Sequence, residues 1–434
     1  MGYDGRMSEM SQGDAQNVSI QAGQVFQPRT PINAHELFAG RWDQLTAVAD
    51  AVGQVGLHAV IYGERGVGKT SLANVIRPVL RVFDEPADTE SPPPGKLRLI
   101  VKVNTHRNDT FSVVWRRAFD EISISHNRPV LGFGRSGAEQ DVVPLVKAWN
   151  LPAELNIDVI RRVLSRTDNS VFIFDEFDRL NETATSEFTD LIKALSDYQT
   201  PVTIVAVGVA DTVDGLIEDH ASIGRSLVQV HMPRMRPEEL EDILKKAAEK
   251  LDIQIERSAA DRIVRMSLGL PHYTHLVGLA AVRRACLRLS RTVTKDDVHE
   301  ALDDATKQAE QTLMTEYTNA TRSAQRDALY TPVLLACAIT ASTDIDELGF
   351  FQPSSVVSPL AAILPGNKIV IATFSNHLSD FCNDRRGSVL QRTGQPRAFR
   401  YRFRNPLLPP YVILKGLSSG LVTTEQWEKL LRFS

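Results

Sequence analysis

One short segment restricts the fold of this chain more than any other feature. Residues 63–70 read Gly-Glu-Arg-Gly-Val-Gly-Lys-Thr and match the pattern G-x-x-x-x-G-K-[ST] at every fixed position. The apolar run 58–62 precedes the segment, and a helix is predicted after it over 69–82. Such glycines let backbone N–H groups turn inward around anionic oxygens, and the following helix points its positive end at the same place. The segment therefore predicts a buried strand, a phosphate-binding loop and a helix.

The same loop carries side chains for nucleotide chemistry. Lys69 is expected to reach the β and γ phosphates of ATP, and Thr70 is expected to supply a hydroxyl to Mg²⁺. The alternative is a glycine turn with a solvated lysine, which the flanking strand and helix disfavour. The residues of this region predicted to bind the nucleotide are Gly63, Glu64, Arg65, Gly66, Val67, Gly68, Lys69, Thr70 and Ser71.

Two acidic residues further along the chain complete the predicted site. The apolar run 171–174 reads as a strand and ends directly in Asp175 and Glu176. Asp175 is expected to hold Mg²⁺, directly or through water, and Glu176 is expected to polarise the attacking water as a general base. Taken alone, this pattern is equally typical of a strand that enters a polar turn. Its position downstream of the phosphate loop favours the catalytic interpretation.

Strands and helices alternate through the first half of the chain. Further short apolar runs at 97–103, 203–207 and 227–231 predict an α/β fold, a parallel sheet covered by helices on both faces. After Pro237 the strand patterns stop and helical patterns continue. The predicted divisions are a flexible tail (1–25), an α/β nucleotide-binding domain (26–235), an α-helical lid (236–328), a third unit (329–416) and a C-terminal tail helix (417–434).

Composition excludes several classes of protein. The chain has 434 residues, with 49 Lys and Arg against 53 Asp and Glu, and its net charge of −4 excludes a histone-like basic protein. The three cysteines are far apart in the sequence, which excludes a disulfide scaffold and a cysteine-based zinc site. No apolar run is long enough for a membrane span, and the polar N-terminal region does not resemble a signal peptide. We therefore expect a cytoplasmic protein.

The motifs together resemble those of a known family. With its phosphate loop and Asp175-Glu-Phe-Asp178, the chain resembles the AAA+ ATPases, in particular the origin-recognition and initiator-loader ATPases and the related STAND signalling NTPases. Leu37-Phe-Ala-Gly40-Arg41 is similar to a turn that packs on adenine in these families, which implies a binding role for Gly40 and Arg41. Gly269-Leu-Pro271 is similar to the opening of their helical lid, which implies a role for Pro271 and His272 beside the nucleotide.

The resemblance also implies roles for residues outside these motifs. A polar sensor at the tip of the strand beside the Mg²⁺ strand falls on Asp211 or Thr212, although Asp211 also suits a helix N-cap. Arg225 stands where such ATPases carry an arginine finger that reaches a neighbour's γ-phosphate, and a surface ion pair is the alternative. His272 occupies the place of a lid sensor arginine, and the alternative for it is a packing histidine.

The C-terminal unit combines helices with a hairpin. Helices are predicted over 330–339 and 356–364, with a third that Thr373 caps. Aromatic residues alternate with arginines through 399–404, which predicts a β-hairpin with a buried aromatic face and an exposed arginine face.

Helices followed by a hairpin are similar to the winged-helix domain that initiator-type ATPases append after their lid. Duplex DNA is then a candidate partner, because arginines can contact backbone phosphates. The alternatives are an arginine-rich composition on a solvated face and a module that binds protein. The candidate DNA contacts are Arg385, Arg386, Arg392, Arg397, Arg400, Arg402 and Arg404.

These observations favour an ATP-hydrolysing switch or loader of the AAA+ type that couples its nucleotide state to assembly on DNA. Its predicted cofactors are ATP and Mg²⁺, and a homo-oligomer or a partner protein is expected to stimulate slow hydrolysis. Two alternatives stay open. One is a STAND-like signalling or defence NTPase whose winged helix is an internal latch, and the other is an accessory ATPase that recruits a separate effector protein.

Overall fold

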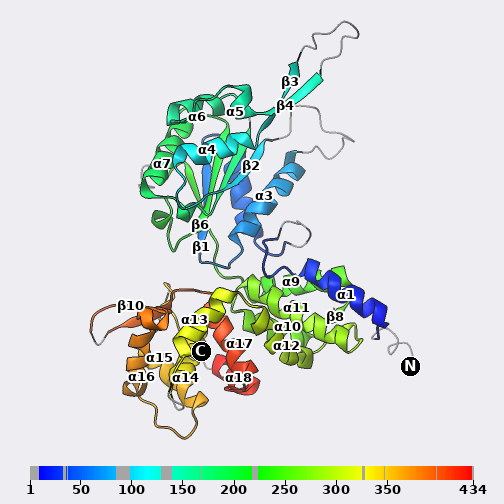
Figure 1. Cartoon of the computed structure of the whole chain (residues 1–434), viewed down its shortest axis with the longest axis vertical. Coiled ribbons are helices and arrows are strands. Elements are labelled where there is room, and N and C mark those ends of the chain that lie inside the picture. Colours follow the sequence, from blue (N-terminus) through cyan, green and yellow to red (C-terminus); the bar gives the residue numbers. More distant parts are fainter. Residues whose placement is uncertain are drawn as a thin grey trace.

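The computed structural model describes residues 9–32, 36, 38–84, 98–128, 139–167, 169–217, 223–324, 328–346, 348–396 and 398–432. Their elements form an α/β part, which contains the large sheet, and a mainly helical part on one side of it (Figure 1). A C-terminal part of helices and one hairpin lies next to the helical part. Within the described residues no helix is both long and apolar enough to cross a membrane.

A five-stranded sheet forms the centre of the α/β part. Its strand order is β2-β5-β6-β1-β7, and every neighbouring pair is parallel. The predicted α/β fold with a parallel sheet is confirmed. The strands are β1 (His58–Gly63), β2 (Ile100–Asn104), β5 (Ser170–Asp175), β6 (Val202–Val209) and β7 (Leu227–His231).

Helices cover both faces of the sheet, as the alternation of strands and helices predicts. α2 (Trp42–Gly53) and α3 (Lys69–Asp84) pack on one face. α4 (Phe111–Asp120), α6 (Ile157–Leu164) and α7 (Glu182–Asp197) form the layer on the other face. Each strand therefore contributes alternate side chains to two separate cores.

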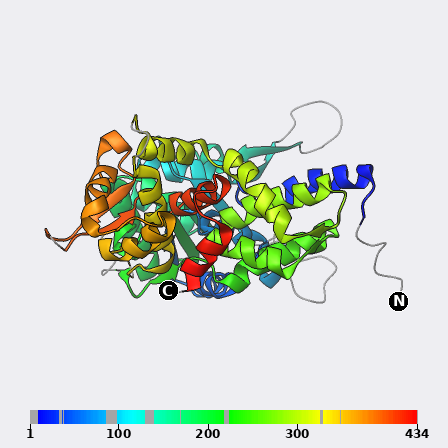
Figure 2. The same ribbon diagram turned by 90° about the horizontal axis from the view of Figure 1, so that it is seen from below.

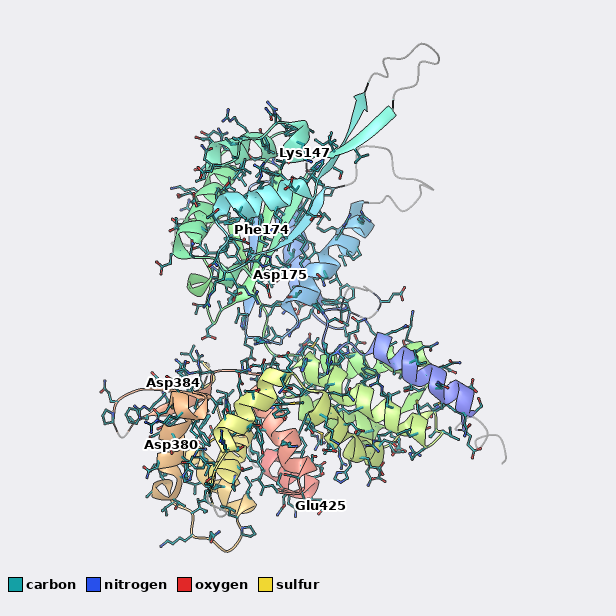
Figure 3. All side chains as sticks on the ribbon, in the orientation of Figure 1. Lys147, Phe174, Asp175, Asp380, Asp384 and Glu425 are labelled. Atoms are coloured by element: carbon teal, nitrogen blue, oxygen red, sulfur yellow. The ribbon has the colours of Figure 1, made fainter. Side chains whose placement is uncertain are left out.

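β5 shows how this alternation positions its last residue. Val171 and Ile173 belong to the core beneath α3, whereas Phe172 and Phe174 pack with Trp115 of α4, whose ring centroid lies 5.2 and 5.0 Å from theirs. Asp175 follows the same period, so it lies on the α3 face at the end of the strand. Figure 3 labels Phe174 within the sheet and Asp175 nearer the helical part.

One hairpin of the α/β part has no counterpart in the sequence-based prediction. β3 (Ser123–Arg128) and β4 (Glu139–Pro144) pair in antiparallel register and project away from the body of the molecule (Figure 1). The short helix α5 (Leu145–Ala148) follows β4. Two single 3₁₀ turns, η2 (Phe177–Arg179) and η3 (Val213–Gly215), follow β5 and β6.

The helical part begins at the predicted place, but it also contains two short strands, β8 and β9, that the sequence did not predict. Pro237 is the first residue of α9, where its missing N–H costs nothing. The predicted break at Gly269-Leu-Pro271 separates α10 from α11. The elements are α9 (Pro237–Leu251), β8 (Gln254–Ile255), α10 (Arg257–Ser267), α11 (Pro271–Leu287), β9 (Thr292–Val293), α12 (Lys295–Gln308) and α13 (Gln311–Thr321).

The predicted flexible tail over 1–25 is wrong for the residues that form α1 (Gln12–Val25). This helix packs against α9 and α11 and buries a stripe of small apolar side chains that includes Ala15, Val18 and Ala22. Phe26, directly after the helix, is fully buried against Gly278, where a Cβ would lie 2.7 Å from the ring. α1 is therefore a docked element of the helical part.

The C-terminal part consists of α14 (Tyr330–Thr343), α15 (Pro353–Ile363), α16 (Ile371–Phe381), η4 (Asp384–Arg386), β10 (Leu390–Thr393), β11 (Arg400–Phe403), α17 (Leu408–Ser418) and α18 (Thr424–Arg432). β10 and β11 pair in antiparallel register, so the predicted hairpin is confirmed. α17 packs against both α12 and α14 and lies between the helical part and the rest of the C-terminal part (Figure 2).

Two details of this part differ from the prediction. Val370, not Thr373, is the N-cap residue of α16, because the Thr373 hydroxyl accepts a hydrogen bond from the Val370 N–H from inside the first turn. The predicted division at residue 416 falls inside α17, so the C-terminal tail does not start there.

Candidate nucleotide-binding site

A cavity of about 710 Å³ lies where the α/β part meets the helical part. The loop after β1, the ends of β5 and β6, and the start of α11 all contribute to its wall. Most of the predicted site residues meet here. Those that line the cavity are Arg41, Arg65, Gly66, Val67, Gly68, Lys69, Thr70, Ser71, Asp175, Glu176, Pro271 and His272.

The phosphate loop has the backbone shape that its glycines predict. Gly66 and Gly68 adopt φ values of +91° and +97°, a region that side chains with a Cβ rarely occupy. The Lys69 ammonium donates hydrogen bonds to the carbonyl oxygens of Gly63 (2.9 Å) and Glu64 (2.7 Å) and so spans the loop. Burial lowers the pKa of Lys69 to about 8, while nearby carboxylates oppose the shift.

The two predicted metal ligands come together from distant parts of the sequence. The Thr70 hydroxyl donates a hydrogen bond of 3.4 Å to Asp175 Oδ1, although the residues are 105 positions apart. Asp175 is almost fully buried, and its Oδ2 accepts no hydrogen bond from a described residue but lies 3.0 Å from the Lys102 ammonium in an ion pair. A hydroxyl and a buried carboxylate oxygen with spare lone pairs suit a hard cation such as Mg²⁺. The residues present therefore fit the predicted metal.

Glu176 sits at the mouth of the same site. The Glu176 backbone has the left-handed φ of +59°, which turns the side chain out of the strand direction. The Glu176 carbonyl oxygen accepts a hydrogen bond from the Thr105 hydroxyl (2.6 Å). The partly exposed Glu176 carboxylate forms an ion pair with Arg179 at 3.0 Å. Asp178 accepts a hydrogen bond from the Val209 N–H (2.8 Å) and so ties the ends of β5 and β6 together.

Arg41 is buried, but it contacts backbone. Its guanidinium donates hydrogen bonds to the carbonyl oxygens of Val67 (3.3 Å) and Pro233 (2.5 Å), and its N–H donates to Glu239 (3.1 Å). Burial lowers the pKa of the Arg41 guanidinium, and the charge of Glu239 opposes this. Arg41 thus ties the phosphate loop to the segment that leads into α9. Leu37, the first residue of the predicted adenine turn, lies outside the described residues.

Pro271 and His272 line the cavity from the start of α11. Pro271 is the first residue of α11, and its ring would be 3.9 Å from a Cβ on Gly68. The His272 Nδ1 donates a hydrogen bond of 2.6 Å to the Pro28 carbonyl oxygen. Burial lowers the pKa of His272, which disfavours the positive charge that a sensor arginine would carry.

The connection between α1 and α2 crosses the cavity, which the sequence did not predict. Residues 27–32 line it, and the Ile32 N–H donates a hydrogen bond to the Ser71 hydroxyl (3.1 Å). The Pro28 contact with His272 attaches the other end of this connection to α11. The segment therefore bridges the phosphate-loop helix and α11. The prolines at 28 and 31 are the one sequence signal of a non-helical connection here.

Five predicted site residues lie outside this cavity. Gly40 packs against Glu239, and Gly63, Glu64 and Asp211 line a second cavity of about 760 Å³ between the loop and the C-terminal part. Arg225 is exposed and makes no side-chain hydrogen bond or ion pair with another described residue. The roles of these residues stay predictions.

The arginines of the C-terminal hairpin are less free than the prediction of an exposed arginine face implies. Arg402 forms an ion pair with Asp211 (2.9 Å) and Arg400 with Asp346 (2.6 Å). Arg386 lies over the Tyr330 ring at 3.6 Å and Arg392 over the Phe399 ring at 4.3 Å. Tyr401 and Phe403 are buried as predicted, whereas Phe399 is only partly buried. The exposed side chains of Arg385 and Arg404 make no hydrogen bond or ion pair with described residues, and Arg397 lies outside them.

The arrangement suits the handling of a nucleotide's phosphates. The loop N–H groups and Lys69 can bind phosphate oxygens, and Thr70 and Asp175 would hold the metal. When bound, Mg²⁺ supplies positive charge that neutralises the phosphate oxygens. Glu176, on the open side of the site, can accept a proton from water.

The sheet order, the phosphate loop and the buried acid at the end of β5 define a P-loop NTPase of the STAND and AAA+ type. The sequence profile of the family described as Novel STAND NTPase 1 matches residues 31–324, more than half of the chain. The chain belongs to this family. No curated protein sequence matches the chain.

Several solved structures superpose on the chain at low sequence identity. A Walker-type ATPase of Pyrococcus abyssi superposes with a TM-score of 0.50 at 15% identity, and the match covers 89% of this chain and 99% of that one. The ORC2 protein of Aeropyrum pernix gives 0.45 at 14% identity, covering 94% and 98%. The RuvB Holliday junction branch migration motor of Thermotoga maritima gives 0.41 at 17% identity, covering 85% and 94%.

Proposed function

We propose that this protein is a switch that binds and hydrolyses ATP, and that its C-terminal part responds to the state of the nucleotide site. The observation that carries the proposal is the meeting of Thr70 and Asp175 in a cavity lined by the phosphate loop. Glu176 is the proposed general base, and Mg²⁺ the proposed cofactor. Phe38, Ile243 and Pro271 contribute apolar side chains to the cavity wall, which suits adenine.

Contacts between the C-terminal part and the nucleotide site support the response to nucleotide. A Cβ on Gly66 would lie 2.6 Å from Leu407, so Leu407 packs directly on the phosphate loop. The Tyr273 hydroxyl of α11 donates a hydrogen bond to the Leu407 carbonyl oxygen. Arg402 pairs with Asp211 beyond the end of β6. These contacts of Leu407 and Arg402 favour the STAND-like interpretation, in which the C-terminal part is an internal latch.

Nucleotide binding and turnover test the proposal directly. We expect the purified chain to bind fluorescent ADP and ATP in the presence of Mg²⁺, to prefer them to the guanine nucleotides and to release phosphate slowly. Absence of nucleotide binding would exclude the switch, and equal affinity for guanine nucleotides would exclude the adenine assignment.

DNA binding is a second candidate function, supported by the exposed side chains of Arg385 and Arg404, which form no hydrogen bond or ion pair with described residues. In this proposal α14, α15, α16 and the β10–β11 hairpin act as a winged helix. Arg385 and Arg404 contact the duplex without any rearrangement. Arginines such as Arg402 contact it only after their internal ion pairs break. Arg225 would then reach the nucleotide of a neighbouring subunit in an oligomer on DNA.

Filter binding of duplex DNA at low and high salt, with and without ATP, tests this second function. We expect binding that ATP strengthens and salt weakens, because arginine–phosphate contacts release counterions. Binding that is absent at low salt with ATP present would exclude direct DNA contact and leave a protein partner as the output of the switch.

A further inference from the structure

Asp175 has a close neighbour that the phosphate-loop and acidic motifs do not include. The ammonium of Lys102, on β2, lies 3.0 Å from Asp175 Oδ2. β2 and β5 are parallel neighbours with Asn104 opposite Asp175, so Lys102 is two positions back on the same face of the sheet. Its side chain extends along that face toward the end of β5.

A second residue fixes this ammonium. Asn74, one turn after Thr70 on α3, accepts a hydrogen bond from Lys102 Nζ (2.5 Å) through its side-chain oxygen. β2, α3 and β5 therefore converge on Asp175, and Lys102 is three-quarters buried between them. Such a position restricts a long side chain that elsewhere is solvated. A lysine held in this way indicates a role at the carboxylate it faces.

Lys102 stands behind Asp175 as seen from the nucleotide cavity. Thr70 and Asp175 line that cavity, whereas Lys102 and Asn74 do not. Asp175 Oδ1 is oriented by the Thr70 hydroxyl and by the Glu176 N–H (2.9 Å), so the carboxylate keeps its direction without the lysine. The contribution specific to Lys102 is its positive charge, which is within ion-pair distance of the carboxylate.

We propose that Lys102 is a positioning residue that partly neutralises Asp175 and so lets the site hold a nucleoside diphosphate without Mg²⁺. This inference rests on the proposed nucleotide binding and adds a residue to it. Without metal, the phosphates face a carboxylate whose charge the ammonium offsets. With metal, Lys102 and Mg²⁺ share one carboxylate and repel each other, which lowers the affinity for the metal.

The experiment measures the dissociation constant of fluorescent ADP in excess EDTA and in excess Mg²⁺, and it compares the ratio of the two constants between variants. Lys102→Met removes the charge and keeps the aliphatic stem. We expect it to weaken binding in EDTA and to raise the ratio of the constant in EDTA to the constant in Mg²⁺ about tenfold, because the charge of Asp175 is no longer offset. Lys102→Arg keeps the charge and should leave the ratio close to that of the parent.

Control variants separate this effect from a structural one. Lys250→Met removes an exposed lysine paired with Glu36 and should change neither constant. Lys102→Gln is a second neutral variant, used if Lys102→Met does not fold, and is expected to shift the ratio in the same direction. Titration of the nucleotide-free protein with Mn²⁺ should show tighter metal binding in either neutral variant.

The possible results have different consequences. An unchanged ratio in a folded neutral variant, or an equal loss of affinity in both buffers, would overturn the role of Lys102. If the parent protein binds ADP in neither buffer, the proposed nucleotide function fails instead.

Discussion

The phosphate loop and the β10–β11 hairpin are both short segments rich in chemistry, and they differ in where their partners lie. In the loop, Lys69 binds the carbonyl oxygens of Gly63 and Glu64, only a few residues away. In the hairpin, Arg400 and Arg402 bind Asp346 and Asp211, which are 54 and 191 positions distant. The loop makes its own geometry, whereas the hairpin receives its geometry from the rest of the fold.

This difference explains which inferences from the sequence succeed. The loop's shape follows from its own glycines, so the motif alone predicts the backbone that the structure shows at Gly66 and Gly68. The alternation in the hairpin predicts which side chains face inward, but it contains no information about Asp211. An arginine that the pattern places on an exposed face is therefore held against the α/β part. The geometry of the loop depends on its own residues, whereas the position of the hairpin arginines depends on how the hairpin packs against the rest of the protein.

The largest expected effect tests the phosphate loop. Lys69→Ala should abolish measurable binding of ATP and ADP, a loss of about 1000-fold if two charge-assisted contacts to phosphate disappear. Isothermal titration with Mg²⁺–ATP measures it. Lys147→Ala is the matched control, because Lys147 is exposed on α5 and lies far from Asp175 (Figure 3). Retained binding in Lys69→Ala would mean that the loop is not the phosphate site.

The next effect concerns turnover without a change in binding. Glu176→Gln keeps the size of the side chain but cannot accept a proton, so hydrolysis should fall about 100-fold or more while ATP affinity stays near that of the parent. Single-turnover release of phosphate measures the loss. Glu182→Gln, at the exposed start of α7, is the control. Normal turnover in the Glu176 variant would transfer the role of general base to another group.

The same difference decides which other elements could be predicted from the sequence: those set by nearby residues were predicted, and those set by contacts with distant residues were not. Strands such as β5 and β6 could be predicted because each is a largely apolar run that is buried on both faces. α1 was missed because its buried face consists of small residues such as Ala15 and Ala22, and only contact with α11 identifies that face. Lys102 was missed for a related reason, since its partner Asp175 becomes a neighbour only when β2 and β5 pair.

The smallest expected effect tests the contact between the β10–β11 hairpin and the α/β part. Arg402→Ala removes the ion pair with Asp211, whose side chains are 25% and 55% exposed. Exposed pairs contribute about 0.2–1 kcal/mol, so the release rate of fluorescent ADP should rise only about two- to fivefold, measured by stopped-flow displacement. Arg400→Ala is a close control, because Arg400 lies on the same strand but pairs with Asp346 inside the C-terminal part. If both variants release ADP at the same rate as the parent, the Arg402 pair does not couple the hairpin to the nucleotide. If Arg400→Ala accelerates release as much as Arg402→Ala, the coupling depends on the stability of the hairpin rather than on its contact with the α/β part.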